Sequence, residues 1–171
     1  MINMEETEFH REEHADDIVL TKNGYQKLQE ELDYLKNTRR WEVAKRLEHA
    51  RAFGDVTENS EYEDAKLEQA FVAGRILDIE RTLDNARIIR EEELDATSVA
   101  LGSKVVLKDM DRKEELVFRL VSSPEARGNR ECISDQSPVG KAIVGRRVGE
   151  AVEVSVPSGE VIKYKILKIE K

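Results

Sequence analysis

The stretch Gly54-Asp55-Val56-Thr57-Glu58-Asn59-Ser60-Glu61-Tyr62 decides the architecture of this chain, because it lies between two long segments that are patterned like pairing helices. Glycine is the usual residue just past the end of a helix, and Asp-x-x-Glu is typical of a helix start. A turn this short forces the two helices to run antiparallel. Its acidic residues therefore lie at the far tip of a hairpin, where they are displayed and fill no core.

The second helix has the clearer repeat. Its seam positions are spaced alternately by three and four residues, and they are Tyr62, Ala65, Gln69, Val72, Ile76, Ile79, Leu83 and Ala86. This 3.5-residue period is typical of a coiled-coil seam. About 32 residues at ~1.5 Å each predict a rod of ~45–50 Å.

The first helix is expected to begin at about Lys22, with Thr21 as its cap. Its apolar positions are Tyr25, Leu28, Leu32 and Leu35, followed after a shift of phase by Val43, Leu47 and Ala50. Such a change of phase unwinds a coiled coil locally. Trp41 is expected to pack on a helix face or at the domain junction.

Composition fits long solvated helices better than one large core, since 37% of the 171 residues are charged and 5% are aromatic. The single cysteine, Cys132, excludes an internal disulfide and is consistent with a reducing, cytoplasmic location. No run approaches the roughly 18 apolar residues that span a bilayer, so we expect no membrane partner. We expect a monomer.

The net charge of −8 is unevenly distributed. Residues 1–99 hold 25 acidic and 14 basic residues, a net of −11, whereas the remainder holds 11 and 14, a net of +3. Autonomous nucleic-acid binders concentrate Lys and Arg, so a partner is expected to bring this chain to nucleic acid if it acts there. Residues 1–18, with seven acids and one base, are expected to form a disordered acidic tail.

Beyond residue 97 the pattern changes to short alternating runs typical of strands. These runs cover residues 104–108, 115–121, 151–156 and 161–169, and Pro157-Ser158-Gly159-Glu160 is a good hairpin turn between the last two. Ser137 as cap, Pro138 at the first position and Gly145 as stop predict one short helix. We therefore predict an α+β chain: a tail (1–18), an antiparallel coiled-coil hairpin (19–92) and a β-rich domain (93–171).

The two tip acids have two interpretations. As a capping box, Asp55 caps the second helix and Glu58 reaches back to the cap amide, so both serve only that helix. Alternatively, the carboxylates face outward and hold Mg²⁺, which takes oxygen ligands and is commonly held by one or two carboxylates together with phosphates. Two carboxylates are an incomplete site, so a partner would complete it.

Arg51 and Lys66 flank the tip, one on each helix. They fit contacts to a phosphate backbone, and they equally fit two solvated charges among many. The sequence has no nucleophile–base motif, no glycine-rich phosphate loop and no zinc spacing.

Together these residues resemble the Gre family of bacterial transcription elongation factors. The resemblance covers residues 19–171. It rests on the tip stretch, and further on 28–36, Arg39-Arg40, 74–80, 133–138 and 157–161. It implies an FKBP-like C-terminal domain that docks on RNA polymerase and a coiled coil that enters the secondary channel of the polymerase. The chain is then an accessory factor and no enzyme by itself.

The resemblance also implies residue roles. Asp55 and Glu58 match the tip acids that support the second catalytic Mg²⁺ while the polymerase hydrolyses the extruded 3′ RNA of a backtracked complex. Ser137 and Pro138 match the polymerase-contacting segment. Arg51 and Lys66 are expected to contact the nascent RNA. The chain departs from the family pattern at Trp41, at Thr57, at Gly140-Lys141 and in its acidic tail.

Three other functions remain open. An inhibitory Gre homologue would keep the fold and change the acidic tip, whereas this chain retains both acids. A coiled-coil scaffold or chaperone predicts apolar residues at the tip. A peptidyl-prolyl isomerase predicts an aromatic-lined pocket, for which the C-terminal half offers only Phe118 and Tyr164.

Overall fold

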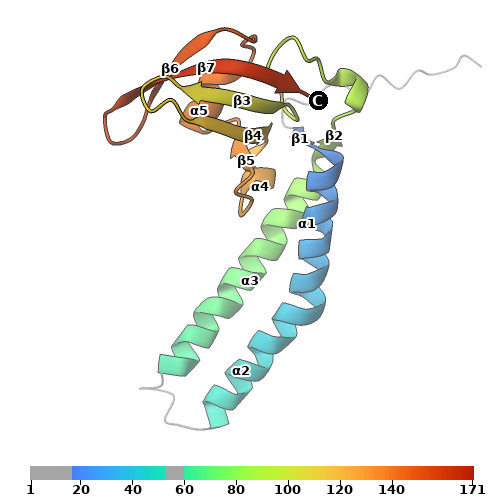
Figure 1. The fold of residues 1–171 in the computed structure, drawn as a ribbon. Coiled ribbons are helices and arrows are strands. Elements are labelled where there is room, and N and C mark those ends of the chain that lie inside the picture. The colour runs from blue at the N-terminus through green and yellow to red at the C-terminus, as the bar shows by residue number, and fades with distance from the viewer. Residues whose placement is uncertain (1–16, 53–59) are drawn as a thin grey trace, which may run out of the picture.

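The computed structural model describes residues 17–52 and 60–171, and Figure 1 shows a two-stranded helical rod with a β-rich domain at one end. The α+β class predicted from the sequence is confirmed. The predicted tail falls outside the described residues except for Asp17 and Ile18, and Ile18 begins the first strand.

The first arm of the rod contains three consecutive helical segments: α1 (Lys22–Tyr34), a π-helical segment (Leu35–Arg39) and α2 (Arg40–Ala52). Thr21 caps α1 as predicted, because its side chain accepts the N–H of Gly24. The π-helical segment coincides with the predicted change of phase. Leu35 and Val43 are both buried although eight residues separate them, one more than a heptad, and a π-type turn accommodates the extra residue.

The second arm is α3 (Ser60–Asp84), which packs antiparallel to the first along one apolar seam (Figure 1). The larger seam side chains Leu28, Val43, Val72 and Ile79 are each exposed by 4% or less. Gln69 is exposed, and the last predicted seam position, Ala86, lies in a strand instead of the helix. Near the tip the seam continues as a separate cluster of Leu47, Ala50, Tyr62 and Ala65.

Two short strands close the base of the rod. β1 (Ile18–Leu20) pairs in parallel with β2 (Ala86–Ile88), so the chain just before α1 is hydrogen-bonded to the chain just after α3. Leu20 is fully buried against the seam. A single 3-10 turn (Glu91–Glu93) follows and leads into the second domain.

The second domain is a five-stranded sheet of order β5-β4-β3-β7-β6. Its strands are β3 (Lys104–Asp109), β4 (Glu115–Val121), β5 (Cys132–Ser134), β6 (Ala151–Ser155) and β7 (Val161–Glu170). Two short helices, α4 (Ser123–Ala126) and α5 (Pro138–Ile143), complete it. β6 and β7 pair antiparallel around the predicted turn, where Gly159 has a φ of 88°. Val99, 2% exposed, belongs to the core of this domain although it precedes every strand of the sheet.

Trp41 departs from expectation. Its side chain is 63% exposed, and the ammonium of Lys45 lies 4.8 Å from the centre of its ring. The expectation that Trp41 packs on a helix face or at the domain junction is therefore wrong. No helix in the described ranges combines the length and the apolar character that crossing a bilayer requires.

The π-helical segment makes a testable prediction about single-residue deletions. Deleting Asn37, an exposed residue of this segment, restores heptad spacing between Leu35 and Val43, so we expect the melting temperature to change by less than about 2 °C. Deleting Ala44, an exposed residue of α2, rotates Leu47 out of the seam. The loss of one buried leucine, about 2 kcal/mol, should lower the melting temperature by about 4–8 °C.

Circular dichroism at 222 nm during heating measures both deletions. Equal losses in the two variants would contradict the assignment of the π-helical segment as the place where an extra residue is absorbed.

Candidate functional site

The tip predicted to carry the chemistry lies partly beyond what the structure describes. Asp55 and Glu58 fall outside the described residues, so their predicted roles stay predictions. The flanking helix ends are described: α2 to Ala52 and α3 from Ser60, at the end of the rod away from the β-rich domain (Figure 1). Ala52 and Ser60 therefore lie at the end of the rod that is far from the β-rich domain.

The structure brings Arg51 and Lys66 together. The guanidinium of Arg51 lies 5.6 Å and the ammonium of Lys66 5.7 Å from the centre of the Tyr62 ring. Tyr62 is itself buried in the cluster nearest the tip. Cation–π attraction at exposed sites contributes about 0.5–1 kcal/mol, so the ring holds two cations from opposite helices at one place. Both side chains are exposed at this position, which suits contact with an anionic polymer.

Further along the rod, basic side chains are paired with acids across the two helices. Arg46 donates from Nε to Glu61 at 2.5 Å and from Nη1 to Glu68 at 2.9 Å. Arg39 also donates to Glu68, and it donates to Glu42 at 2.8 Å. The hydrogen bond from Arg46 lowers the pKa of Glu61, and the Glu61 carboxylate in turn raises the pKa of Arg46. The positive potential of Arg39 and Arg46 is thus largely cancelled.

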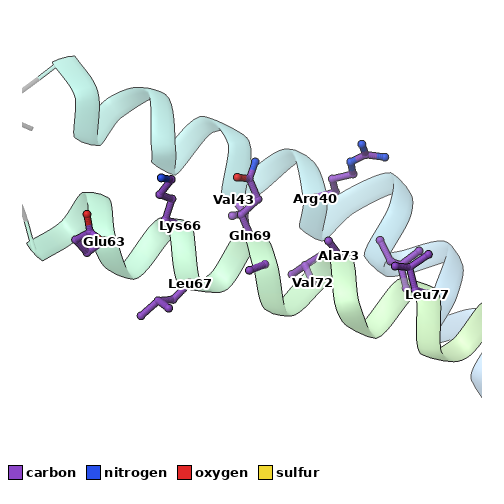
Figure 2. Close-up of a pocket in the computed structure, with 11 residues that line it drawn as sticks. Arg40, Val43, Glu63, Lys66, Leu67, Gln69, Val72, Ala73 and Leu77 are labelled. Carbon is purple, nitrogen blue, oxygen red and sulfur yellow. The ribbon is translucent and has the colours of Figure 1, made fainter.

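A groove runs along the side of the rod, between α2 and α3 (Figure 2). Its wall is mainly apolar and includes Leu67, Ala70, Ala73 and Leu77. Leu67 is 70% and Leu77 52% exposed, and nearby Phe71 is 74% exposed. The scaffold interpretation predicts apolar residues at the tip of the rod, whereas Leu67, Phe71 and Leu77 lie along its length. The groove offers no paired nucleophile and base.

The predicted docking residues lie at the start of α5. Ser137 caps this helix, accepting the N–H of Gly140 at 3.0 Å and donating to the carbonyl of Ser134 at 2.6 Å. Pro138 is exposed at the first helical position. A Cβ on Gly140 would lie 2.1 Å from the Ser134 carbonyl oxygen, so the helix start is packed tightly on the end of β5. Ser137 and Pro138 are therefore presented on a rigid corner.

Two other chemistries gain no support within the described ranges, residues 17–52 and 60–171. Phe118 and Tyr164 are 5% and 7% exposed and form part of the core, so neither lines an open aromatic pocket. No group of three or more His, Cys, Asp or Glu side chains is arranged to hold a metal ion there. Cys132 is half-buried, and burial raises the pKa of its thiol, which disfavours the reactive thiolate.

The pair of Arg46 and Glu61 gives a prediction about pH. Because its pKa is lowered in the folded state, the Glu61 carboxylate adds stability above its unfolded pKa of about 4.3 and loses that contribution as the pH falls through the folded value. We expect Arg46→Gln to return the pKa of Glu61 toward about 4.3. Arg40→Gln, which removes an exposed arginine on the same helix, should leave it unchanged.

Carbon-13 NMR titration of the glutamate carboxyls measures these values. An unchanged Glu61 titration in Arg46→Gln would contradict the pairing.

Comparison with known proteins identifies the family. A model described as "Transcription elongation factor, N-terminal" matches residues 18–88, and one described as "Transcription elongation factor, GreA/GreB, C-term" matches residues 94–171. The two matches cover the rod and the β-rich domain respectively.

Individual relatives agree. The chain is 52% identical to transcription elongation factor GreA of Syntrophomonas wolfei and 50% identical to GreA of Acetivibrio thermocellus, each over 155 residues that cover 91% of this chain and 97% of the relative. A solved structure of the transcription factor Gfh1 is 32% identical over 92% of this chain and all of that one, with a TM-score of 0.45. The resemblance predicted from the sequence is confirmed: the chain belongs to the GreA/GreB family of transcription elongation factors, and among its curated relatives it is similar to GreA.

Proposed function

We propose that this protein is a transcript cleavage factor of the cytoplasm, which acts as a monomer on RNA polymerase. Its β-rich domain docks on the polymerase, and its rod enters the secondary channel. There it stimulates the polymerase to hydrolyse the 3′ end of RNA in backtracked, arrested complexes. The observation that carries the proposal is the retention of Asp55 and Glu58 between the two arms of a long hairpin, in a chain about half identical to GreA proteins.

The donor chemistry of the tip fits a shared Mg²⁺ ion. Asp55 and Glu58 supply carboxylate oxygens, which Mg²⁺ prefers, and two carboxylates leave most of its six positions to the polymerase, water and RNA phosphates. When bound, such an ion activates a water molecule and offsets charge on the reacting phosphate. Asp55 and Glu58 would hold and orient it, and the remaining catalytic groups would belong to the polymerase. The chain is then an accessory factor.

The described residues near the tip suit guidance of RNA. Arg51 and Lys66 converge on Tyr62 from opposite helices and are exposed, so they would contact phosphates of the extruded strand. Arg39 and Arg46 are already paired with carboxylates. Two cations would attract RNA toward the tip but bind it weakly, because each phosphate contact adds only a part of the affinity for RNA.

The first test concerns the tip acids. We expect Asp55→Ala and Glu58→Ala each to reduce RNA cleavage in a backtracked polymerase complex by at least about a hundredfold, because each removes a metal ligand. Binding to polymerase should stay within about twofold of the unaltered protein. The cleaved RNA is sized by gel electrophoresis, and binding is measured by competition.

Two alternatives predict different results. A capping box predicts loss of about 1 kcal/mol of helix stability with cleavage preserved. An inhibitory factor predicts that the unaltered protein slows the polymerase and releases no RNA fragment. Normal cleavage by both variants would show that the acids are not catalytic.

The second test concerns docking. We expect a fragment of residues 93–171 to fold alone and to compete with the full chain for polymerase, because it retains the whole sheet and core. The fragment must begin before Val99, whose backbone is hydrogen-bonded to Arg146 at 2.8 Å and whose side chain is in the core. Failure of a folded fragment to compete in a binding assay would count against docking through this domain. Pro138→Ala in the fragment tests the predicted contact, with Glu160→Ala in the exposed β6–β7 turn as its control.

A further inference from the structure

One side chain of the β-rich domain forms a hydrogen-bonded contact with the base of the rod. Glu125, in α4, accepts the backbone N–H of Thr21 at 2.9 Å and the Thr21 hydroxyl at 2.5 Å. The same hydroxyl accepts the N–H of Gly24 at 2.9 Å. Glu125, Thr21 and Gly24 therefore form a continuous chain of hydrogen bonds from one domain into the first turn of the other, which we call the junction contact.

Gly24 shows that the surface of α1 is shaped for this carboxylate. Glycine is disfavoured inside helices relative to alanine, yet it occupies the first turn of α1 and is buried. A Cβ at this position would lie 2.1 Å from the carboxyl carbon of Glu125 and 2.4 Å from one of its oxygens. The absence of a side chain at Gly24 therefore creates the space that the carboxylate of Glu125 occupies.

The charge of Glu125 also suits its position. A helix N-terminus attracts negative charge, and the first turn of α1 contains no acidic residue of its own. Glu125 supplies that charge from the other domain. A second tie, between Arg127 and Asp78 on α3, is long at 3.8 Å and joins side chains that are 64% and 59% exposed, so it contributes little. Among these ties the junction contact is the stronger constraint on domain orientation.

The orientation of the rod relative to the β-rich domain matters, because a small rotation at its base causes a large displacement at its tip. A tilt of about 10° at the base of a rod of ~45 Å moves its tip by roughly 8 Å. Misplacing a catalytic group by about 1 Å can cost on the order of a hundredfold in rate. If the rod of the free protein can tilt, only a small fraction of molecules would therefore have the rod in line with the channel when the domain docks, and the others would not bind productively.

We propose that Glu125 is a positioning residue, which fixes the direction of the rod relative to the docking domain through Thr21 in the space left by Gly24. The consequence for RNA cleavage rests on the function proposed above, whereas the consequence for domain orientation in the free protein does not. Glu125 itself touches neither RNA nor metal in this proposal.

The first experiment measures orientation in the free, full-length protein. Nitroxide labels are placed at Glu48→Cys on the rod and Glu160→Cys in the exposed β6–β7 turn, in a Cys132→Ser background, and the distance between them is measured by double electron–electron resonance. We expect a narrow distribution with Glu125 intact and a distribution at least about twice as wide in Glu125→Ala. Glu114→Ala, which removes an exposed glutamate of the same domain, should leave it narrow.

Gly24→Ala separates positioning from stability. Alanine raises the helix propensity of α1, so the rod should be at least as stable, but its methyl group displaces the flexible Glu125 carboxylate. We expect the wide distribution in this variant as well, with unchanged helix content. Thr21→Ser keeps the hydroxyl and should retain the narrow distribution. Distributions as narrow as the reference in both Glu125→Ala and Gly24→Ala would overturn the proposal.

The second experiment measures cleavage of a backtracked complex at increasing protein concentration. If the variable orientation of the rod lowers the fraction of molecules that can bind productively, the protein concentration for half-maximal cleavage should rise on the order of tenfold in Glu125→Ala and Gly24→Ala. The maximal rate should stay within about twofold of the unaltered protein. A tip variant such as Glu58→Ala should instead lower the maximal rate. An unchanged half-maximal concentration would overturn the positioning role in cleavage. Absence of cleavage with the unaltered protein would overturn the proposed function, and the distance measurement would still decide the orientation.

Discussion

The apolar seam of the hairpin is the interaction on which the rest of the molecule depends. Leu28, Val43, Val72 and Ile79 are nearly inaccessible although the rod is only two helices thick, so each arm is the main cover for the other's apolar face. Isolated helices of this length are marginal in water, because nucleation is costly and propensity alone is weak. Pairing along the seam therefore stabilises the rod, and the rod in turn places Ala52 and Ser60 at the end away from the β-rich domain.

Ion pairs between the two arms fix their register, which apolar contacts alone do not determine. Arg75 on α3 donates two hydrogen bonds to Glu31 on α1, at 2.7 and 2.8 Å, and its side chain is only 12% exposed. Arg39, in the π-helical segment, and Arg46, on α2, join the first arm to Glu68 on α3. Bidentate and shared pairs of this kind are directional, whereas burial of leucine is not. Part of the charge content of the chain thus serves interhelical register, so these arginines have a structural role within the hairpin.

Periodic segments could be predicted from the sequence, and short tertiary elements could not. The heptads, the cap at Thr21, the change of phase after Leu35 and the longer strands each repeat a local pattern, so they were visible without coordinates. β1, β2, β5 and α4 have three or four residues each, too few for a period, and β1 forms only because the fold brings Ile18 beside Ala86. The role of Glu125 could not be predicted either, because its partner Thr21 lies 104 residues earlier in the chain. The nearness of Arg51 and Lys66 to the tip is visible in the sequence, whereas their shared contact with the Tyr62 ring is recognisable only in three dimensions.

Different parts of this molecule determine its stability and the orientation of the rod relative to the β-rich domain. The seam of the rod and the core of the sheet share no residue, and each is a cluster of its own. The contacts between the domains include a few polar ones around α1 and α4, and each of these contributes little compared with either core. We therefore expect a loss in the seam to destabilise the rod, and a loss at the junction to leave both domains folded while changing the direction of the rod. Under the proposed function, in which the tip acids act on a distant reacting phosphate, the few contacts at the junction would then matter to function far more than they matter to folding.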